Sequence, residues 1–172
     1  MVSKVALRQT ADTRRRLQPA GVDLTAALAS LLVTALRVAS YLPFGAEPGV
    51  APRPGWLLPV LLEDGDLDWA LYDGRLSVGR CGQREPAGAR LGVEAIAGCD
   101  LVLVPALLVA RDGARLGKGG GSYDRALARA TGLTVALVHD DELVNRLPVE
   151  PHDVPVLAAA TPSLGLVHLT RS

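Results

Sequence analysis

The most constraining feature of the sequence is the run Asp100-Leu-Val-Leu-Val-Pro105, in which four consecutive apolar residues stand between an aspartate and a proline. A strand with one solvated face alternates apolar and polar residues, whereas a strand covered on both faces is apolar throughout. The run therefore predicts a strand inside a parallel sheet. Such a sheet needs covering layers on both of its faces.

The rest of the chain alternates helical and strand patterns around this run. Helices are predicted over 4–17, from the N-cap Asp23 to about Val38, and over 122–131. Strands are predicted over 38–42, 56–62, 69–72, 133–138, 157–160 and 164–169. Proline and glycine predict a loop over 45–55 and irregular structure over 74–91, and a further loop is expected after Pro105. The alternation favours an α/β fold with a mainly parallel sheet.

Length and charge limit the remaining possibilities. A chain of 172 residues suits one domain, which we expect to span 1–172, and its 49% hydrophobic and 21% charged residues are ordinary for a soluble protein. Eighteen basic residues balance eighteen acidic ones, so no net field indicates a nucleic acid or a membrane as partner. The run Arg14-Arg15-Arg16 is predicted to be a solvated helix end. With no apolar signal core and no membrane-length apolar run, we expect a cytoplasmic protein.

The chemistry of the chain is concentrated in Arg115-Leu-Gly-Lys-Gly-Gly-Gly-Ser-Tyr-Asp-Arg125. Glycines in four of the five positions 117–121 allow positive φ angles and let backbone N–H groups surround phosphate oxygens. The helix predicted to follow adds a partly positive N-terminus. Arg115 and Lys118 add full charges, and the Asp124 carboxylate could hold a magnesium ion beside the phosphates.

Two common nucleotide motifs do not fit this loop. A Walker A loop needs a glycine where Asp112 stands and a serine or threonine where Gly119 stands. A dinucleotide fingerprint starting at Gly117 needs a glycine at Ser122 and a strand directly before it. A flexible solvent loop is the alternative interpretation, and the flanking Arg, Lys and Asp side chains favour phosphate binding over it.

The loop resembles the signature of the 5-formyltetrahydrofolate cyclo-ligases, also called methenyltetrahydrofolate synthetases. Their pattern of arginine, hydrophobic residue, three spaced glycines, aromatic, tyrosine and aspartate is matched by Arg115, Gly117, Gly119, Gly121, Tyr123 and Asp124. The preceding 100–105 run and Asp112-Gly113 are similar to the family's strand and turn.

Four more segments resemble the family in the same order. They are Lys4 with Arg8, Tyr41-Leu42 with Glu47, Gly82-Gln-Arg-Glu85-Pro86, and Leu147-Pro148 followed by Glu150-Pro-His-Asp153. The spacing of Lys4 and Arg8 puts both cations on one face of a helix, where they can meet ATP phosphates. The resemblance therefore extends over almost the whole chain.

The resemblance implies a three-layer Rossmann-like α/β domain that uses ATP and Mg²⁺ to cyclise 5-formyltetrahydrofolate, as a monomer or weak dimer. Catalytic roles are implied for Lys4, Arg115 and Lys118. ATP contacts are implied for Lys4, Arg8, Arg115, Leu116, Gly117, Lys118, Gly119, Gly120, Gly121, Ser122 and Tyr123. Folate contacts are implied for Leu42, Glu47, Lys118, Gly119, Gly120, Gly121 and Ser122. Magnesium contacts are implied for Asp124 and Asp153.

The chain departs from the family pattern at several positions. Ser122 stands where the family has an aromatic residue on the substrate side of the loop, and Val109 and Ala110 replace an aromatic residue and an aspartate. Two alternatives stay open for this reason. They are a related ATP-dependent enzyme with another substrate and a non-catalytic protein that binds a nucleotide or a folate. The histidines at 139, 152 and 168 lack metal-ligand spacing and are interpreted as structural or surface groups.

Overall fold

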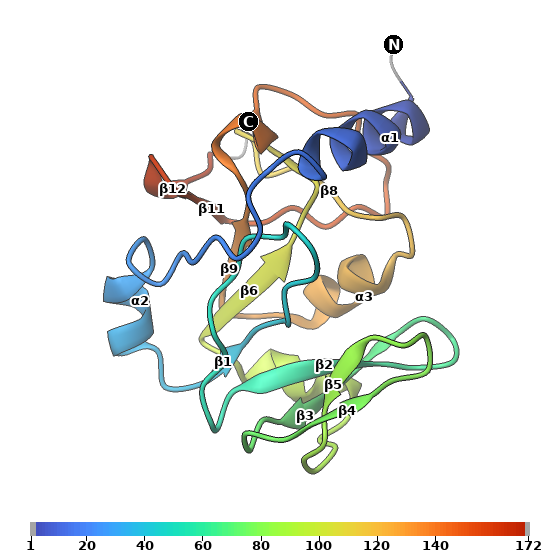
Figure 1. Ribbon diagram of the computed structural model, residues 1–172, viewed down its shortest axis with the longest axis vertical. Helices are drawn as coiled ribbons and strands as arrows, with labels where there is room; N and C mark the ends of the chain where they lie inside the picture. The colour runs from blue at the N-terminus through green and yellow to red at the C-terminus, as the bar shows by residue number, and fades with distance from the viewer. Residues whose placement is uncertain (1–2, 171–172) are drawn as a thin grey trace.

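A seven-stranded sheet forms the centre of the computed structural model, which describes residues 3–170 (Figure 1). In spatial order its strands are β12 (Gly165–His168), β11 (Ala158–Thr161), β9 (Leu133–Leu137), β6 (Leu101–Pro105), β1 (Val38–Ala39), β2 (Leu57–Leu61) and β3 (Leu67–Leu71). The five inner strands pair in parallel, and β12 and β3 pair antiparallel at the two edges. The helices are α1 (Lys4–Arg15), α2 (Ala29–Thr34) and α3 (Ser122–Arg129), with 3-10 turns η1 (Val93–Gly98) and η2 (Asp140–Glu142).

Strand β6 is buried on both faces, as its apolar run predicts. Val102 and Val104 point into one core cluster, which includes side chains of η1 and α3. Leu101 and Leu103 point into a second cluster on the opposite face, which includes Leu32 of α2. Successive strand side chains point to opposite faces, so one apolar run fills both layers. The prediction of a three-layer α/β fold with a mainly parallel sheet is confirmed.

The helix predicted from Asp23 to Val38 is wrong over most of its length. Only Ala29–Thr34 is α-helical, and Asp23 instead forms a bridge with Gly49. The Asp23 carboxylate does cap a turn, because its Oδ1 accepts hydrogen bonds from the N–H and hydroxyl groups of Thr25. The apolar pattern was correct about burial, since Leu24, Leu28 and Leu32 all lie in the core, but tertiary packing replaced most of the helix by turns.

Two segments predicted to lack regular structure contain short strands. Within 74–91, β4 (Leu76–Val78) and β5 (Arg84–Pro86) form a two-stranded antiparallel sheet. After Pro105, β7 (Leu108–Ala110), β8 (Arg115–Leu116) and β10 (Leu143–Val144) form a three-stranded sheet. Pairing with a distant segment, rather than local propensity, makes strands this short stable.

Helix α1 lies above the end of β6 and packs on the three-stranded sheet (Figure 1). It begins at an N-cap, Ser3, whose side chain accepts a hydrogen bond from Ala6 N–H. The prediction of a solvated end for this helix is wrong for Arg15, which is 6% exposed, because its side chain turns toward the core. Among the helices in residues 3–170, none has the length and apolar character that crossing a membrane requires.

A buried ion pair ties the β2–β3 turn to α3. Arg129 donates to both Asp66 carboxylate oxygens, at 2.9 and 2.6 Å. These hydrogen bonds, helped by the N–H of Leu67, hold the pKa of Asp66 below its usual value, although burial acts to raise it. A depressed pKa means that the stabilisation is complete above the unfolded pKa of about 3.9 and is lost as the pH falls through the folded pKa.

We expect Asp66→Asn to lower the free energy of unfolding at pH 7 by about 1.5–3 kcal/mol, the range for hydrogen bonds to charged groups. As the pH falls through the folded pKa of Asp66, the variant and the unsubstituted protein are expected to converge, which urea denaturation between pH 7 and 2 measures. The matched control is Glu63→Gln, whose pair with Arg80 is exposed and contributes little. A constant difference between Asp66→Asn and the unsubstituted protein at all pH values would contradict the linkage.

Candidate active site

The glycine-rich loop at 117–121 connects β8 to α3 at the carboxyl end of the parallel strands. Gly119 and Gly121 have φ angles of 102° and 69°, which side chains rarely adopt. A Cβ atom at Gly117 would stand 2.8 Å from Nη1 of Arg115, and one at Gly119 would touch the guanidinium of Arg8 at 3.4 Å. The loop is therefore glycine-rich both because of its backbone conformation and because two arginines pack directly against it.

A cavity of about 430 Å³ lies between this loop, the N-terminal helix and the β2 region. Every residue for which the sequence predicts a site role lines it. These residues are Lys4, Arg8, Leu42, Glu47, Arg115, Leu116, Gly117, Lys118, Gly119, Gly120, Gly121, Ser122, Tyr123, Asp124 and Asp153. The structure thus gathers in one place residues that lie up to 149 positions apart in the sequence. Their individual roles stay predictions.

One side of the cavity is cationic. Arg8 Nε donates to the carbonyl of Gly117 at 3.0 Å, which joins α1 to the loop. Lys4, at the start of α1, contacts Asp153 and donates to Glu150 at 2.7 Å. Burial acts to lower the pKa of Lys4, but the hydrogen bonds to these two carboxylates outweigh it and raise the pKa. Lys4 is therefore charged at neutral pH, as phosphate binding requires.

Arg115 and Asp124 form the floor beneath the loop. Their side chains lie 3.3 Å apart, and Arg115 also donates to the carbonyl of Pro105 at 3.2 Å. Asp124 Oδ1 accepts the N–H of Val154 at 3.2 Å, which places this carboxylate beside the segment that carries Asp153. Two carboxylates from distant segments thus meet the cationic side of the cavity.

The side chain of Tyr123, which is partly buried, adds a buried hydroxyl group to this floor. Tyr123 lies beneath the guanidinium of Arg115, with Cζ 5.8 Å from the ring centroid. Burial raises its pKa, so the phenol keeps its proton. Among the described residues, neither its hydroxyl nor Arg115 Nε has a hydrogen-bond partner. Because buried polar groups nearly always have a hydrogen-bond partner, we expect a ligand or a water molecule to bind these two groups.

Another part of the cavity lining carries residues predicted for folate, and it adjoins the glycine-rich loop. Glu47 is buried, and its carboxylate accepts the N–H of Phe44 at 2.9 Å and pairs with Lys118 at 2.7 Å. Leu42 lines the same wall. Lys118 is 60% exposed, so its ammonium can leave Glu47 and reach a ligand without a change in the fold. Glutamate and lysine together offer an acceptor and a donor for polar edges of a ring.

The hydroxyl group of Ser122 is hydrogen-bonded within the protein. Its hydroxyl donates to the carbonyl of Gly65 at 2.6 Å, and Arg125 Nη2 donates to the same oxygen at 2.6 Å. The start of α3 is therefore tied to the β2–β3 turn. Ser122 still lines the cavity, but its hydroxyl is already used within the protein.

Sequence reasoning missed several residues that line the cavity. They are Arg15, Tyr41, Pro59, Leu61, Leu67, Gln83, Arg84, Glu85, Pro105, Ala106, Leu107 and His152. Half of these belong to segments that supported the resemblance, namely Tyr41, Gln83, Arg84, Glu85, Pro105 and His152. The sequence did contain an indication for Arg15. It stands seven residues, or two helical turns, after Arg8, and this spacing places both arginines on the same face of the helix.

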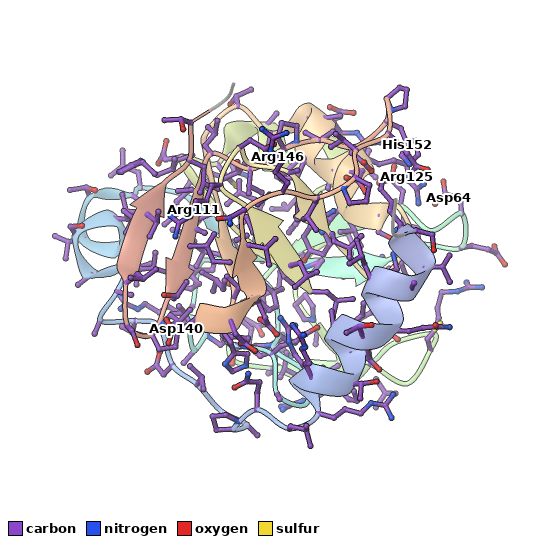
Figure 2. The ribbon with its side chains drawn as sticks, turned by 90° about the horizontal axis from the view of Figure 1, so that it is seen from above. Asp64, Arg111, Arg125, Asp140, Arg146 and His152 are labelled. Atoms are coloured by element: carbon purple, nitrogen blue, oxygen red, sulfur yellow. The ribbon has the colours of Figure 1, made fainter. Side chains whose placement is uncertain are left out.

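His152 was interpreted as a group without metal-ligand spacing, and the structure places it in a possible metal-binding cluster. Ligand atoms of Glu150, His152 and Asp153 lie within 4.8 Å of one another. Figure 2 shows the N-terminal end of α1 reaching toward the loop with the labelled His152, where Lys4 contacts Glu150 and Asp153. The ammonium of Lys4 thus neutralises part of this cluster.

Comparisons with known proteins agree with this geometry. The model of the 5-formyltetrahydrofolate cyclo-ligase family matches residues 4–162. A 5-formyltetrahydrofolate cyclo-ligase of Mycolicibacterium smegmatis is 39% identical, with 97% of each chain covered. An Escherichia coli cyclo-ligase is 42% identical over 37% of each chain.

Solved structures give the same result. The 5,10-methenyltetrahydrofolate synthetase of Aquifex aeolicus aligns with a TM-score of 0.75 and 26% identity, over 96% of this chain and 92% of that one. The synthetase of Mycoplasma pneumoniae, at 18% identity and a TM-score of 0.65 over 90% and 96%, shares the fold. With the sequence, the architecture and the conserved order of the site segments in agreement, this chain belongs to the 5-formyltetrahydrofolate cyclo-ligase family.

Proposed function

We propose that the protein converts 5-formyltetrahydrofolate and ATP into 5,10-methenyltetrahydrofolate, ADP and phosphate. The observation that carries this proposal is one cavity lined by two chemically different groups of residues. Arg8, Arg115 and the glycine loop offer positive charge and backbone N–H groups to phosphates. Glu47 and Leu42 offer an acceptor and an apolar wall to a folate. Substrates that react with each other need such a shared cavity, because positioning supplies much of the rate enhancement.

The reaction solves the problem that a formamide oxygen is a poor leaving group. The formyl oxygen of the folate attacks the γ-phosphorus of ATP, and the bond to the β,γ-bridging oxygen breaks to release ADP. Folate N10 then attacks the activated formyl carbon and loses its proton, the ring closes, and the oxygen leaves with the phosphoryl group as phosphate. Phosphoryl transfer of this kind depends on positioning and on charge neutralisation. Lys4, Arg8, Arg115 and Lys118 are the residues that would neutralise the phosphates.

Magnesium fits the donor set on the phosphate side. Asp124 and Asp153 provide carboxylate oxygens, the ligand type that Mg²⁺ prefers, and both line the cavity. The hydrogen bond from Val154 to Asp124 holds the two segments together. A bound magnesium ion would neutralise phosphate charge there. Arg115 and Lys4, which pair with these carboxylates in the structure, would meet the remaining phosphate oxygens.

We expect Asp124→Asn to raise the magnesium concentration for half-maximal turnover by about tenfold, because an amide offers one neutral oxygen in place of a charged carboxylate. A magnesium titration at saturating ATP and folate measures this. The matched control is Asp112→Asn, at a carboxylate that caps the turn before the loop and donates no ligand to the cavity. An unchanged titration in Asp124→Asn would remove Asp124 from the metal site.

The reaction itself is tested by mixing purified protein with 5-formyltetrahydrofolate, ATP and magnesium and following the near-ultraviolet absorbance of the methenyl product. A rise that needs all three components supports the proposal. Tight ATP binding without any rise in absorbance would support the residues assigned to phosphate binding and would contradict those assigned to folate binding. Ser122, which replaces an aromatic residue, would then be the place to begin the search for another substrate.

A further inference from the structure

Glu142, a buried carboxylate in η2, is not used in the reaction described above, yet three groups bind it. It is 3% exposed and lies against Arg15. Arg15 Nε donates to its Oε1 at 2.7 Å and Nη2 contacts its Oε2. The backbone N–H of His139 donates to Oε2 at 2.8 Å. Arg15 Nη2 also donates to the carbonyl of Ala106 at 2.6 Å. The carboxylate is thus neutralised and held at the carboxyl end of β6.

The ring of His139 continues this network toward the folate side. His139 is 4% exposed, and its Nε2 lies 2.7 Å from the carbonyl oxygen of Ala46. A carbonyl oxygen can only accept a hydrogen bond, so Nε2 carries the hydrogen. Ala46 directly precedes Glu47, whose carboxylate faces the cavity and pairs with Lys118. The imidazole therefore holds the peptide next to the predicted folate acceptor.

Other contacts hold different parts of the same loop. The Tyr41 hydroxyl donates to the carbonyl of Pro48. Gly49 donates to Val22 at 3.0 Å and accepts from Leu24 at 2.9 Å. These bonds secure the loop after Glu47 and join it to the core. Before Glu47, the hydrogen bond from His139 to Ala46 comes from a distant element, 93 positions away in sequence.

We propose that His139 is a positioning residue for the folate half of the site, with its backbone N–H held by Glu142, which Arg15 neutralises. The imidazole sets the position of the Ala46–Glu47 peptide and so the direction of the Glu47 carboxylate. The proposal rests on the proposed function, because it assumes that Glu47 meets the folate. Lys4 and Arg8, the phosphate-side residues of α1, share no hydrogen bond with His139 among the described residues, so nucleotide binding is expected to stay unaffected.

The test compares three replacements of His139. His139→Leu removes the donor, His139→Asn keeps a polar amide that is too short to reach Ala46, and His139→Gln places an amide nitrogen near the position of Nε2. Because the Leu and Asn variants lose one hydrogen bond, we expect their KM for 5-formyltetrahydrofolate to rise by about fivefold. KM for ATP is expected to stay within about twofold, and the Gln variant to recover most of the folate KM. His168→Leu, at an exposed histidine on β12, is the matched control.

The readouts separate positioning from a merely structural role. A structural role would raise both KM values together in proportion to lost stability, and that pattern would overturn the proposal. An unchanged folate KM in the Leu and Asn variants, or a Gln variant no better than Leu, would overturn it as well. If the unsubstituted protein forms no methenyl product, the proposed function fails by itself. Equilibrium binding of 5-formyltetrahydrofolate and of ATP to the same variants then still tests the proposal for His139, which predicts weaker folate binding and unchanged ATP binding.

Discussion

Lys118→Ala is expected to lower kcat/KM by about 100- to 1000-fold, the effect of removing one preorganised charged donor, roughly 2.7–4 kcal/mol. Lys118 stands in the centre of the glycine loop, with its ammonium 2.7 Å from Glu47 and 5.8 Å from the ring centroid of Phe44. In the proposed reaction, this position lies between the residues that would bind the folate and those that would bind phosphate, where charge would develop as the formyl oxygen is phosphorylated. Steady-state kinetics with both substrates varied measures the loss.

The loss of stability in the same variant is expected to be modest, because the Lys118 ammonium is 60% exposed and water screens its pair with the buried Glu47. Arg146→Ala, at an exposed arginine labelled in Figure 2, is the matched control for loss of one positive charge, with no expected effect on kcat/KM. Lys118→Arg keeps the charge on a longer and planar group, so partial recovery is expected. Undiminished turnover in Lys118→Ala would rule out a catalytic role for this lysine.

Arg15→Ala is expected to destabilise the protein by about 3–5 kcal/mol, because it leaves the Glu142 carboxylate buried without its cation. Both side chains are almost fully buried, at 7% and 4% exposure. Such a loss is a large share of the total stability of a domain. Urea denaturation, with the free energy extrapolated to water, measures it, and intact far-ultraviolet circular dichroism at low temperature shows whether the variant still folds.

Arg16 provides the control for this prediction. It is adjacent in sequence, has the same side chain and also forms an ion pair, with Asp12 at 2.7 Å, but this pair is exposed. Replacing it by alanine is expected to cost about 0.3–0.5 kcal/mol, the usual value for a helical pair four residues apart. Equal effects of Arg15→Ala and Arg16→Ala would contradict the assignment of Arg15 to the core.

Much of the architecture was predictable because its signals are local. The consecutive apolar residues of β6 predict a buried strand, and the closely spaced glycines before α3 predict a loop. The helix predicted from Asp23 to Val38 failed because Leu24 and Leu28 are buried by turns as effectively as by a helix. Strands β4 and β5 were missed because each is only three residues long and depends on its partner. Short elements of this kind have little intrinsic preference of their own.

The sequence by itself determined the order of the main helices and strands, and it predicted a phosphate-binding loop with a set of polar residues around it, because side-chain type and spacing express these properties directly. Only the tertiary structure decided that Arg15 is buried against Glu142 while Arg16 is exposed, and that His139 meets the loop of Glu47. These contacts join residues separated by about half of the chain or more. These contacts are stabilised by burial and by the pairing of charges in the protein interior, away from water. Neither property can be read from the order of residues along the chain.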